Sequence, residues 1–365
     1  MLKPIRYVSC SPALRACRRL QVQLMEWLCD PNVGAGDINR GNLVPPRVPT
    51  QIETNWVWRF LQKVDSGQSL LTRAITLATM SPTEKQLLQN WVNIVDSLEN
   101  QFKANPPAWP AKPAISDSAW QAFRELMEAF YEKGLRSGLP YDANGTEVTN
   151  GGVNYAQFVK AFRDEHRLSP DPYAREICVL CGGVLDDIEV DHWIAKSAYP
   201  LLSVCVNNLL PICGKCNSTD NKGVKPVYSP IGFTDWFHPY LHPTNGRIYL
   251  DYDIQTLSIT AVAVNPSDTE KVSNLDTLLN LGKRWTQEFK AEYLKQQKVL
   301  LRREKQRISN NNQRHTQAEI LNHFQTVQAD LLETEPNFEV HKTLLTGMME
   351  PARLAAWKTE LELVT

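Results

Sequence analysis

Apolar residues recur every three or four positions along the first part of the chain, which is the period of an amphipathic helix. Leu14, Cys17, Leu20, Leu24 and Leu28 share one such face. The same spacing predicts further helices over residues 56–64, 84–102, 120–134, 155–166 and 274–307. Residues 248–264 are β-branched and alternating instead, and predict a pair of strands. The pattern therefore indicates an α+β protein that is mainly α.

Segments rich in glycine and proline separate these elements. Residues 34–49 read as a polar loop, 106–113 as a stiff proline-rich linker, and 145–152 as a glycine- and asparagine-rich break. Gly134 is placed to end the helix before it. A chain of 365 residues is long enough for several domains. We expect four regions: an N-terminal helical region (1–105), a linker and helical region (106–170), a central module (171–232), and a C-terminal region with a strand pair followed by long helices (233–365).

Composition is that of an ordinary globular protein, with 42% hydrophobic and 22% charged residues and a net charge of −1. No apolar run is long enough to cross a membrane, so no membrane partner is expected. Four cysteines lie outside any metal-type spacing, which favours a reduced, cytoplasmic compartment; these are Cys10, Cys17, Cys29 and Cys205.

The charge is unevenly distributed near the C-terminus. Residues 283–307 carry nine Lys or Arg against three Glu, whereas the segment from 330 onward carries seven acids against three Lys or Arg. A basic helix of this kind is suited to nucleic-acid phosphates. It is equally suited to pairing with the acidic tail or with a partner subunit. The residues expected to follow phosphates are Lys290, Lys295, Lys298, Arg302 and Arg303.

The most specific chemical signal is a pair of Cys-x-x-Cys motifs, Cys178/Cys181 and Cys213/Cys216. Four thiolates at this spacing predict a closed tetrahedral zinc site, which has no open position for catalysis. Asp191 and His192 lie between the two motifs, Asn208 opens an Asn-Leu-Leu segment, and Asn217 directly follows the last cysteine. Carboxylate and amide oxygens suit Mg²⁺ or Mn²⁺, and a histidine can accept a proton at neutral pH.

Residues 175–230 thereby resemble the HNH family of nucleases. The resemblance implies a central zinc-stapled ββα-metal module with helical flanking regions. It implies that His192 is the general base, that Asp191 and Asn217 hold the catalytic Mg²⁺ or Mn²⁺, and that Asn208 orients the base. The family often carries a lysine one helical turn after its third position, contacting a phosphate. Here two extra residues intervene, so Lys222 would be that lysine and Asn221, one turn along a continuous helix, is an alternative ligand to Asn217.

The resemblance implies a metal-dependent endonuclease that cleaves DNA. Large helical flanks are similar to those of prokaryotic restriction and antiphage-defence nuclease subunits, including the Septu type, so an ATPase or other defence-system partner or a homo-oligomer is expected. Two alternatives remain: a non-catalytic zinc module that binds DNA or a partner, and a nuclease silent until its partner docks.

Asp191 and His192 on a regular strand would point to opposite faces. We therefore expect a bend in the strand or a helix wrapped around its edge, and a solvent-facing imidazole.

Overall fold

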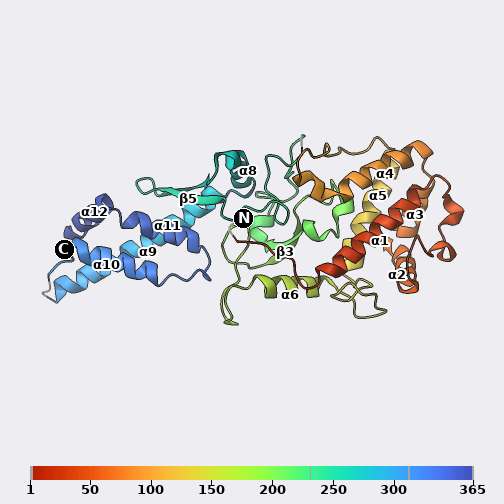
Figure 1. The fold of residues 1–365 in the computed structure, drawn as a ribbon. Helices are drawn as coiled ribbons and strands as arrows, with labels where there is room; N and C mark the ends of the chain where they lie inside the picture. Colours follow the sequence, from red (N-terminus) through yellow and green to blue (C-terminus); the bar gives the residue numbers. More distant parts are fainter. Residues whose placement is uncertain (1–2, 231, 311–312, 364–365) are drawn as a thin grey trace.

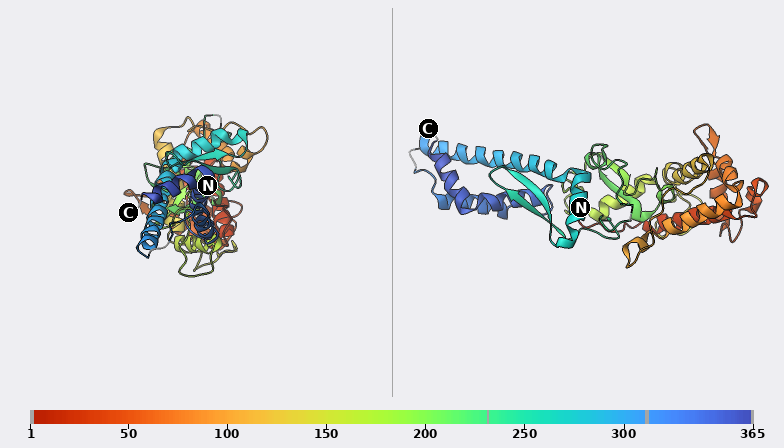
Figure 2. Two further views of the ribbon diagram at one scale, coloured as in Figure 1. Left: turned by 90° about the vertical axis from the view of Figure 1, so that its left-hand side faces the viewer. Right: turned by 90° about the horizontal axis from the view of Figure 1, so that it is seen from above.

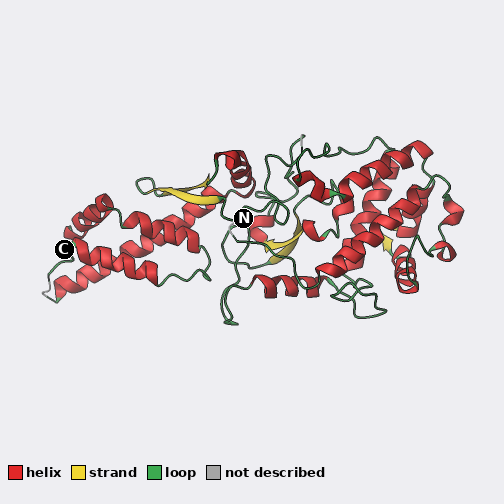
Figure 3. Cartoon of the chain, viewed as in Figure 1, coloured by secondary structure: helices red, strands yellow, loops and turns green. Residues whose placement is uncertain are grey.

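The computed structural model describes residues 3–230, 232–310 and 313–363. The chain is elongated, with an N-terminal group of helices at one end and a C-terminal group at the other (Figure 1, and from two further sides in Figure 2). A small sheet that contains β3 lies between them. Helices dominate and the sheets are small (Figure 3), which confirms the α+β, mainly α fold class.

Five helices build the N-terminal end: α1 (Ser11–Cys29), α2 (Gln51–Leu61), α3 (Leu70–Ala78), α4 (Pro82–Asp96) and α5 (Asp117–Ala129). The apolar face predicted for α1 is fully buried. Capping boxes at Thr50 and Ser81 fix the starts of α2 and α4, because side chain and backbone there satisfy each other's hydrogen bonds. The helix α3 was missing from the sequence prediction, which had no element between 64 and 84.

The connection from α5 to the central part contains one difference from the prediction. Gly134 does not end a helix, because a π-helical turn (Phe130–Leu135) continues through it. A Cβ at Gly134 would lie 3.4 Å from the ring of Trp56, so this glycine permits close approach of α2. The proline-rich segment 106–113 has no regular structure, but its Trp109 is buried against Tyr199 and Phe233. Helix α6 (Tyr155–His166) begins at Asn154, whose side chain caps it.

The central sheet pairs β3 (Ile188–His192) with β4 (Leu209–Cys213) in antiparallel register, with Asp191 opposite Leu210. The short helix α7 (Gly214–Asn217) follows β4 directly. The predicted strand pair is present as β5 (Ile248–Asp253) and β6 (Ser258–Ala263), and a small hairpin joins β1 (Val64–Asp65) to β2 (Gln68–Ser69). Short 3₁₀ turns link these elements: Ala35–Asp37, Arg40–Asn42, Leu98–Phe102, Pro200–Leu202, Val206–Asn208 and Pro266–Asp268.

The long helix predicted over 274–307 is two helices, α8 (Thr269–Leu279) and α9 (Leu281–Ser309). Asn280 adopts a left-handed conformation with φ of 49°, which asparagine tolerates, and this breaks the run. α9 buries Trp285, Phe289 and Leu300 and packs against β6, α11 (Phe338–Met348) and α12 (Pro351–Glu362), and these two helices pack against α10 (Gln317–Ala329). No helix in the described part of the chain is long and apolar enough to cross a membrane.

Candidate metal centre and adjoining cavity

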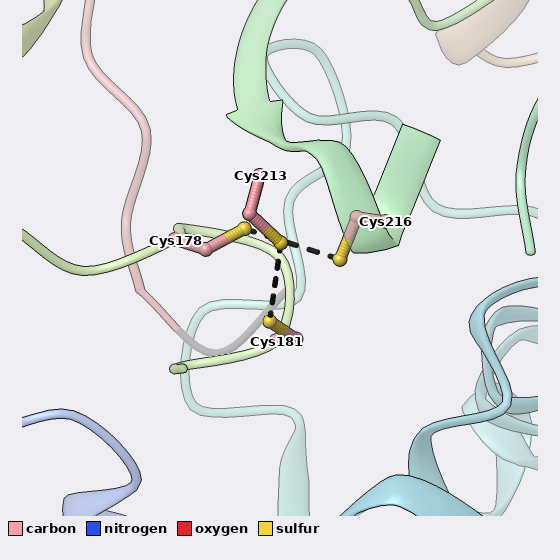
Figure 4. A group of neighbouring side chains, drawn as sticks. All are labelled: Cys178, Cys181, Cys213 and Cys216. Carbon is pink, nitrogen blue, oxygen red and sulfur yellow. Dashed lines mark hydrogen bonds between the residues drawn. The ribbon is translucent and has the colours of Figure 1, made fainter. Parts of the chain in front are cut away.

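Four cysteine side chains converge at the end of the central sheet (Figure 4). Cys178 and Cys181 come from the loop before β3, Cys213 ends β4, and Cys216 lies in α7. All four are buried, and their Sγ atoms lie within 4.8 Å of one another. The Sγ atoms of Cys178 and Cys216 are 3.9 Å apart, and those of Cys181 and Cys213 are 4.0 Å apart.

These separations fit a metal centre and not disulfides. Four sulfurs at ~2.3 Å from a tetrahedral zinc ion lie roughly 3.8 Å from one another, whereas a disulfide needs about 2.05 Å. All eight cysteines of the chain are free thiols. The cluster can therefore hold a structural metal ion such as zinc, as the sequence spacing predicted.

Distant segments of the chain bond to the first cysteine loop. The amide of Lys3 donates to the carbonyl of Val179 (3.2 Å), and the amide of Asn337 donates to the carbonyl of Gly182 (2.7 Å). The indole of Trp285, at the start of α9, donates to the carbonyl of Cys181 (3.0 Å). The guanidinium of Arg284 donates to Sγ of Cys216 (3.3 Å). Hydrogen bonds to ligand sulfurs and ligand loops orient metal ligands, so these contacts support the cluster.

Asp191 and His192 lie at the end of β3 and line one cavity of about 600 Å³. Both side chains are buried, at 7% and 6% exposure. Both residues are paired within β3, Asp191 with Leu210 and His192 with Leu209, and β3 ends at His192. Beyond it, the amide of Trp193 donates to the carbonyl of Asn208 (2.9 Å), which keeps the following loop beside β4.

The sequence had suggested a solvent-facing imidazole at His192, but the structure buries this side chain. Its Nε2 lies 2.9 Å from the carbonyl oxygen of Ser203, and its ring meets Tyr131 edge to face at 4.7 Å. A carbonyl can only accept, so Nε2 carries the proton and Nδ1 of the neutral ring is the acceptor. Burial lowers the pKa of His192 to about 3, assisted by the positive charges of Lys196 and Lys222. The ring is thus held neutral.

The carbonyl of Ser203 is positioned by the N-terminal helices. The hydroxyl of Ser203 donates to the carbonyl of Met127 in α5 (2.6 Å) and accepts from the side chain of Gln21 in α1 (3.2 Å). Ser203 and Gln21 are fully buried. Sequence reasoning gave no role to either residue, because nothing in the chain links position 21 to position 203.

Lys222 is fully buried, with its ammonium on the carboxylate of Asp191. Nζ lies 3.1 Å from Oδ1 and 2.9 Å from Oδ2 of Asp191, and donates to the carbonyl of His192 at 2.8 Å. Burial raises the pKa of Asp191, and the charge of Lys222 opposes this shift. The sequence had suggested that Lys222 contacts a phosphate, but here its ammonium neutralises the carboxylate.

Asn208 acts on the backbone around the cavity. It is fully buried, its Oδ1 accepts from the amide of Ile194 (2.7 Å), and its Nδ2 donates to the carbonyls of Ile194 (2.9 Å) and Leu202 (3.2 Å). These bonds connect the loop after β3 to the peptide that precedes Ser203. The carbonyl of Ser203 in turn bonds to the His192 ring.

Asn217 lines the same cavity as Asp191 and His192, whereas Asn221 is not among the lining residues. The amide of Asn217 donates to the carboxylate of Glu189, which also lines the cavity. The amide of Asn221 is used elsewhere: it donates to the carbonyl of Lys215 (2.6 Å) and accepts from Asn280 (2.8 Å). Since α7 ends at Asn217, the continuous helix that would place Asn221 one turn further is absent.

Five charged residues of the cavity were missed by sequence reasoning: Glu128, Glu132, Arg136, Glu189 and Lys196. Glu189 lies two positions before Asp191, so strand alternation places both on one face, and this signal was readable. Arg136 and Lys196 also line the cavity and bring positive charge to it. Lys196 pairs with Glu132 (2.7 Å), and Arg136 covers the rings of Tyr131 and Tyr155. Their positions follow from chain packing that no local pattern indicates.

The predicted phosphate contacts lie on α9. Lys290, Lys298 and Arg302 are exposed, and no ion pair joins them to any other described residue. Lys295 pairs with Glu292 (3.0 Å), and Arg303 bonds to His323 (2.8 Å). A shallow open groove of about 480 Å³ includes Lys298, Arg302 and Lys305. The acidic tail packs on α9 through Arg353, Glu360 and Gln297 and leaves this basic face uncovered.

Comparison with protein-family models, with curated proteins and with solved structures finds no match to this chain. The class of protein therefore rests on the fold and the site alone: a mainly helical protein with a buried four-cysteine cluster that could hold a metal ion, beside a charged cavity.

Proposed function

We propose that the protein is a metal-dependent endonuclease of the HNH type, acting on DNA. The observation that carries the proposal is that Asp191, His192 and Asn217, which match the family motif, line one cavity beside the four-cysteine cluster. Three residues separated by up to 26 positions in the chain thus line the same cavity. Free thiols throughout the chain support a reducing compartment such as the cytoplasm.

His192 would remove a proton from the attacking water at Nδ1, because Nε2–H is engaged with Ser203. The ring is unprotonated, as a general base must be before it acts, but the burial that lowers its pKa also makes it a weak proton acceptor in this structure. Asp191 and Asn217 supply hard oxygen ligands to the cavity, with Glu189 as a further carboxylate. A bound Mg²⁺ or Mn²⁺ would stabilise negative charge on the leaving oxygen. Arg136 and Lys196 would contact the phosphate groups that flank the scissile bond in place of Glu132, with which both pair in this structure.

The exposed basic residues of α9 would extend this interface along a nucleic-acid backbone. The helix has 29 residues and is ~43 Å long, and its first turn is bonded to the cysteine cluster through Arg284 and Trp285. Positive charges on such a rod contribute sequence-independent affinity that falls with salt. Antiphage defence or restriction, with an ATPase partner or a second copy of the chain, remains the context suggested by the resemblance.

Cleavage of supercoiled plasmid with Mg²⁺ or Mn²⁺ tests the proposal. We expect His192→Gln to lower the rate roughly 10²–10⁴-fold, because the amide of glutamine can still donate to Ser203 but cannot accept the proton. His341→Gln, on α11 and outside the cavity, is the matched control and should cleave normally. Equal cleavage by His192→Gln would exclude this mechanism.

Two other results would select the alternatives. DNA binding by the wild-type protein without cleavage, under any divalent cation, would favour a non-catalytic zinc module. Cleavage that begins only when a partner from the native operon is added would identify a partner-dependent nuclease.

A further inference from the structure

A second cavity of about 450 Å³ lies beside the one described above and is separate from the HNH-type motif. It is formed by α2 and by the two chain segments 137–140 and 148–154. Arg136 and Tyr155 line the first cavity, and their chain neighbours Ser137 and Asn154 line the second. The two cavities are therefore separated by the same two chain segments. Its volume lies in the range of small-molecule sites.

The charge of this cavity has one sign. Arg59 and Lys63 line it, and no Asp or Glu does. The guanidinium of Arg59 donates to the carbonyl of Asn55 (3.3 Å), and the ammonium of Lys63 donates to the carbonyl of Lys133 (2.6 Å). Neither cation is paired with a carboxylate among the described residues. Burial lowers the pKa of Lys63, and the nearby charges of Lys133 and Arg59 lower it further.

Residues 149–152 border the same cavity, and the first three of them are exposed to solvent. The four consecutive amides of residues 149–152 donate no hydrogen bond to any described residue, and all four residues line the cavity. Gly152 among them is buried. Successive unpaired amides near a glycine of positive φ, here Gly151 at 74°, form the concave donor sets that bind anions in proteins.

The loop that carries these amides is held in place before any ligand arrives. The amide of Leu139 donates to the carbonyl of Val153, and that of Val153 to the carbonyl of Tyr141, both at 2.8 Å. A Cβ at Gly152 would lie 1.8 Å from the carbonyl oxygen of Leu139, so only glycine permits this approach. The opposite wall is apolar: Trp56 stacks on Phe60 at 5.1 Å, and its indole donates to the carbonyl of Gly138 (3.1 Å).

We propose that this second cavity binds the phosphate group of a nucleotide, with Arg59, Lys63 and the amides of 149–152 as donors and the Trp56–Phe60 wall against its sugar and base. The phosphate can belong to a free nucleotide or to a nucleotide of a nucleic-acid strand. Both sources present the same chemistry to the cavity. The site does not depend on cleavage in the first cavity.

Isothermal titration of the full chain with AMP, inorganic phosphate and adenosine tests the site, without added Mg²⁺ or Mn²⁺. We expect AMP to bind, phosphate to bind more weakly, and adenosine not to bind. Arg59→Gln and Lys63→Gln should each weaken AMP about tenfold, as expected for loss of one charge-assisted hydrogen bond. Arg59 is exposed, so its variant should fold even if Lys63→Gln does not.

Lys103→Gln is the control, because Lys103 is an exposed lysine whose ammonium bonds to Asn100 and which lies outside the cavity. Adenosine binding as tightly as AMP, equal loss in Lys103→Gln, or no binding of AMP at millimolar concentration would each overturn the proposal. Competition between AMP and a single-stranded oligonucleotide would assign the phosphate to the nucleic-acid strand. Independent binding of the two would assign it to a free nucleotide. Because these readouts need no cleavage, they stand or fall apart from the nuclease proposal.

Discussion

The ammonium of Lys222 lies 2.9 Å from Oδ2 of Asp191, and the lysine side chain has no exposure to solvent. A buried ion pair is sensitive to removal of one partner, because the remaining charge is left without compensation. The pair also places a positive charge on the carboxylate expected to bind a divalent cation. If the proposed function holds, Lys222 and the divalent cation would compete for the same oxygens.

Lys222→Met should lower the free energy of unfolding by roughly 3–5 kcal/mol, because it strands the carboxylate of Asp191. The double variant with Asp191→Asn should recover much of this loss. Urea denaturation of both single variants and the double variant measures the coupling. Mn²⁺ should raise the stability of Lys222→Met more than that of the wild type. Additive effects of the two substitutions would refute the coupling.

The two asparagines after Cys216 should behave differently. Asn217→Ala is expected to raise the Mn²⁺ concentration needed for cleavage and to leave stability nearly unchanged, because Asn217 faces the cavity. Asn221→Ala should instead destabilise the fold by about 1–3 kcal/mol, since its buried amide bonds to Lys215 and Asn280. Titrating cleavage against Mn²⁺, alongside thermal melting, separates them. A higher metal requirement in Asn221→Ala alone would move the ligand assignment.

Cys213→Ser should give protein with less than one zinc per chain and a much lower melting temperature. Structural zinc contributes folding free energy on the order of 10 kcal/mol in small isolated modules, and this cluster is buried. Metal analysis of purified protein measures it. Cys10→Ala, at a buried thiol outside the cluster, should retain full zinc content. Full zinc in Cys213→Ser would remove the cluster from consideration as a metal site.

His238 should make the protein less stable in mild acid. Burial lowers its pKa to about 3, and its Nδ1 accepts from the amides of Tyr240 and Leu241 (both 3.3 Å). The folded state thus disfavours protonation, so its stability is complete above the unfolded pKa near 6.5 and falls as pH drops toward 3. Between pH 7 and 5 this histidine should cost about 2 kcal/mol.

His238→Asn keeps an acceptor near the position of Nδ1 and cannot titrate. Denaturation of the wild type and this variant at pH 7 and pH 5 isolates the contribution, because the other histidines are common to both. An identical loss of stability in the two proteins would contradict the assignment.

Local patterns predicted the elements whose signal is local. The face of Leu14 to Leu28, the strand pair at 248–264 and the spacing of the four cysteines all appear in the structure. The break at Asn280 was not predicted, because helix periodicity continues across a single left-handed residue. The hydrogen bonds that position the His192 ring could not be predicted from the sequence either. They run through Ser203 to Met127 and Gln21, which meet only when the N-terminal helices pack on the central sheet.

The first cysteine loop receives the amides of Lys3 and Asn337, and Lys3 also pairs with Glu339 at 2.7 Å. Residues near the two ends of the chain therefore meet at the same few peptides. During synthesis, the loop gains its first neighbour early and its last one only when the C-terminal helices emerge. A protein shortened before Asn337 would retain all four cysteines and the bonds from Lys3 and Trp285, but the carbonyl of Gly182 would lose its backbone donor. Such a truncated chain should bind its metal more loosely, so metal retention would report completion of the chain.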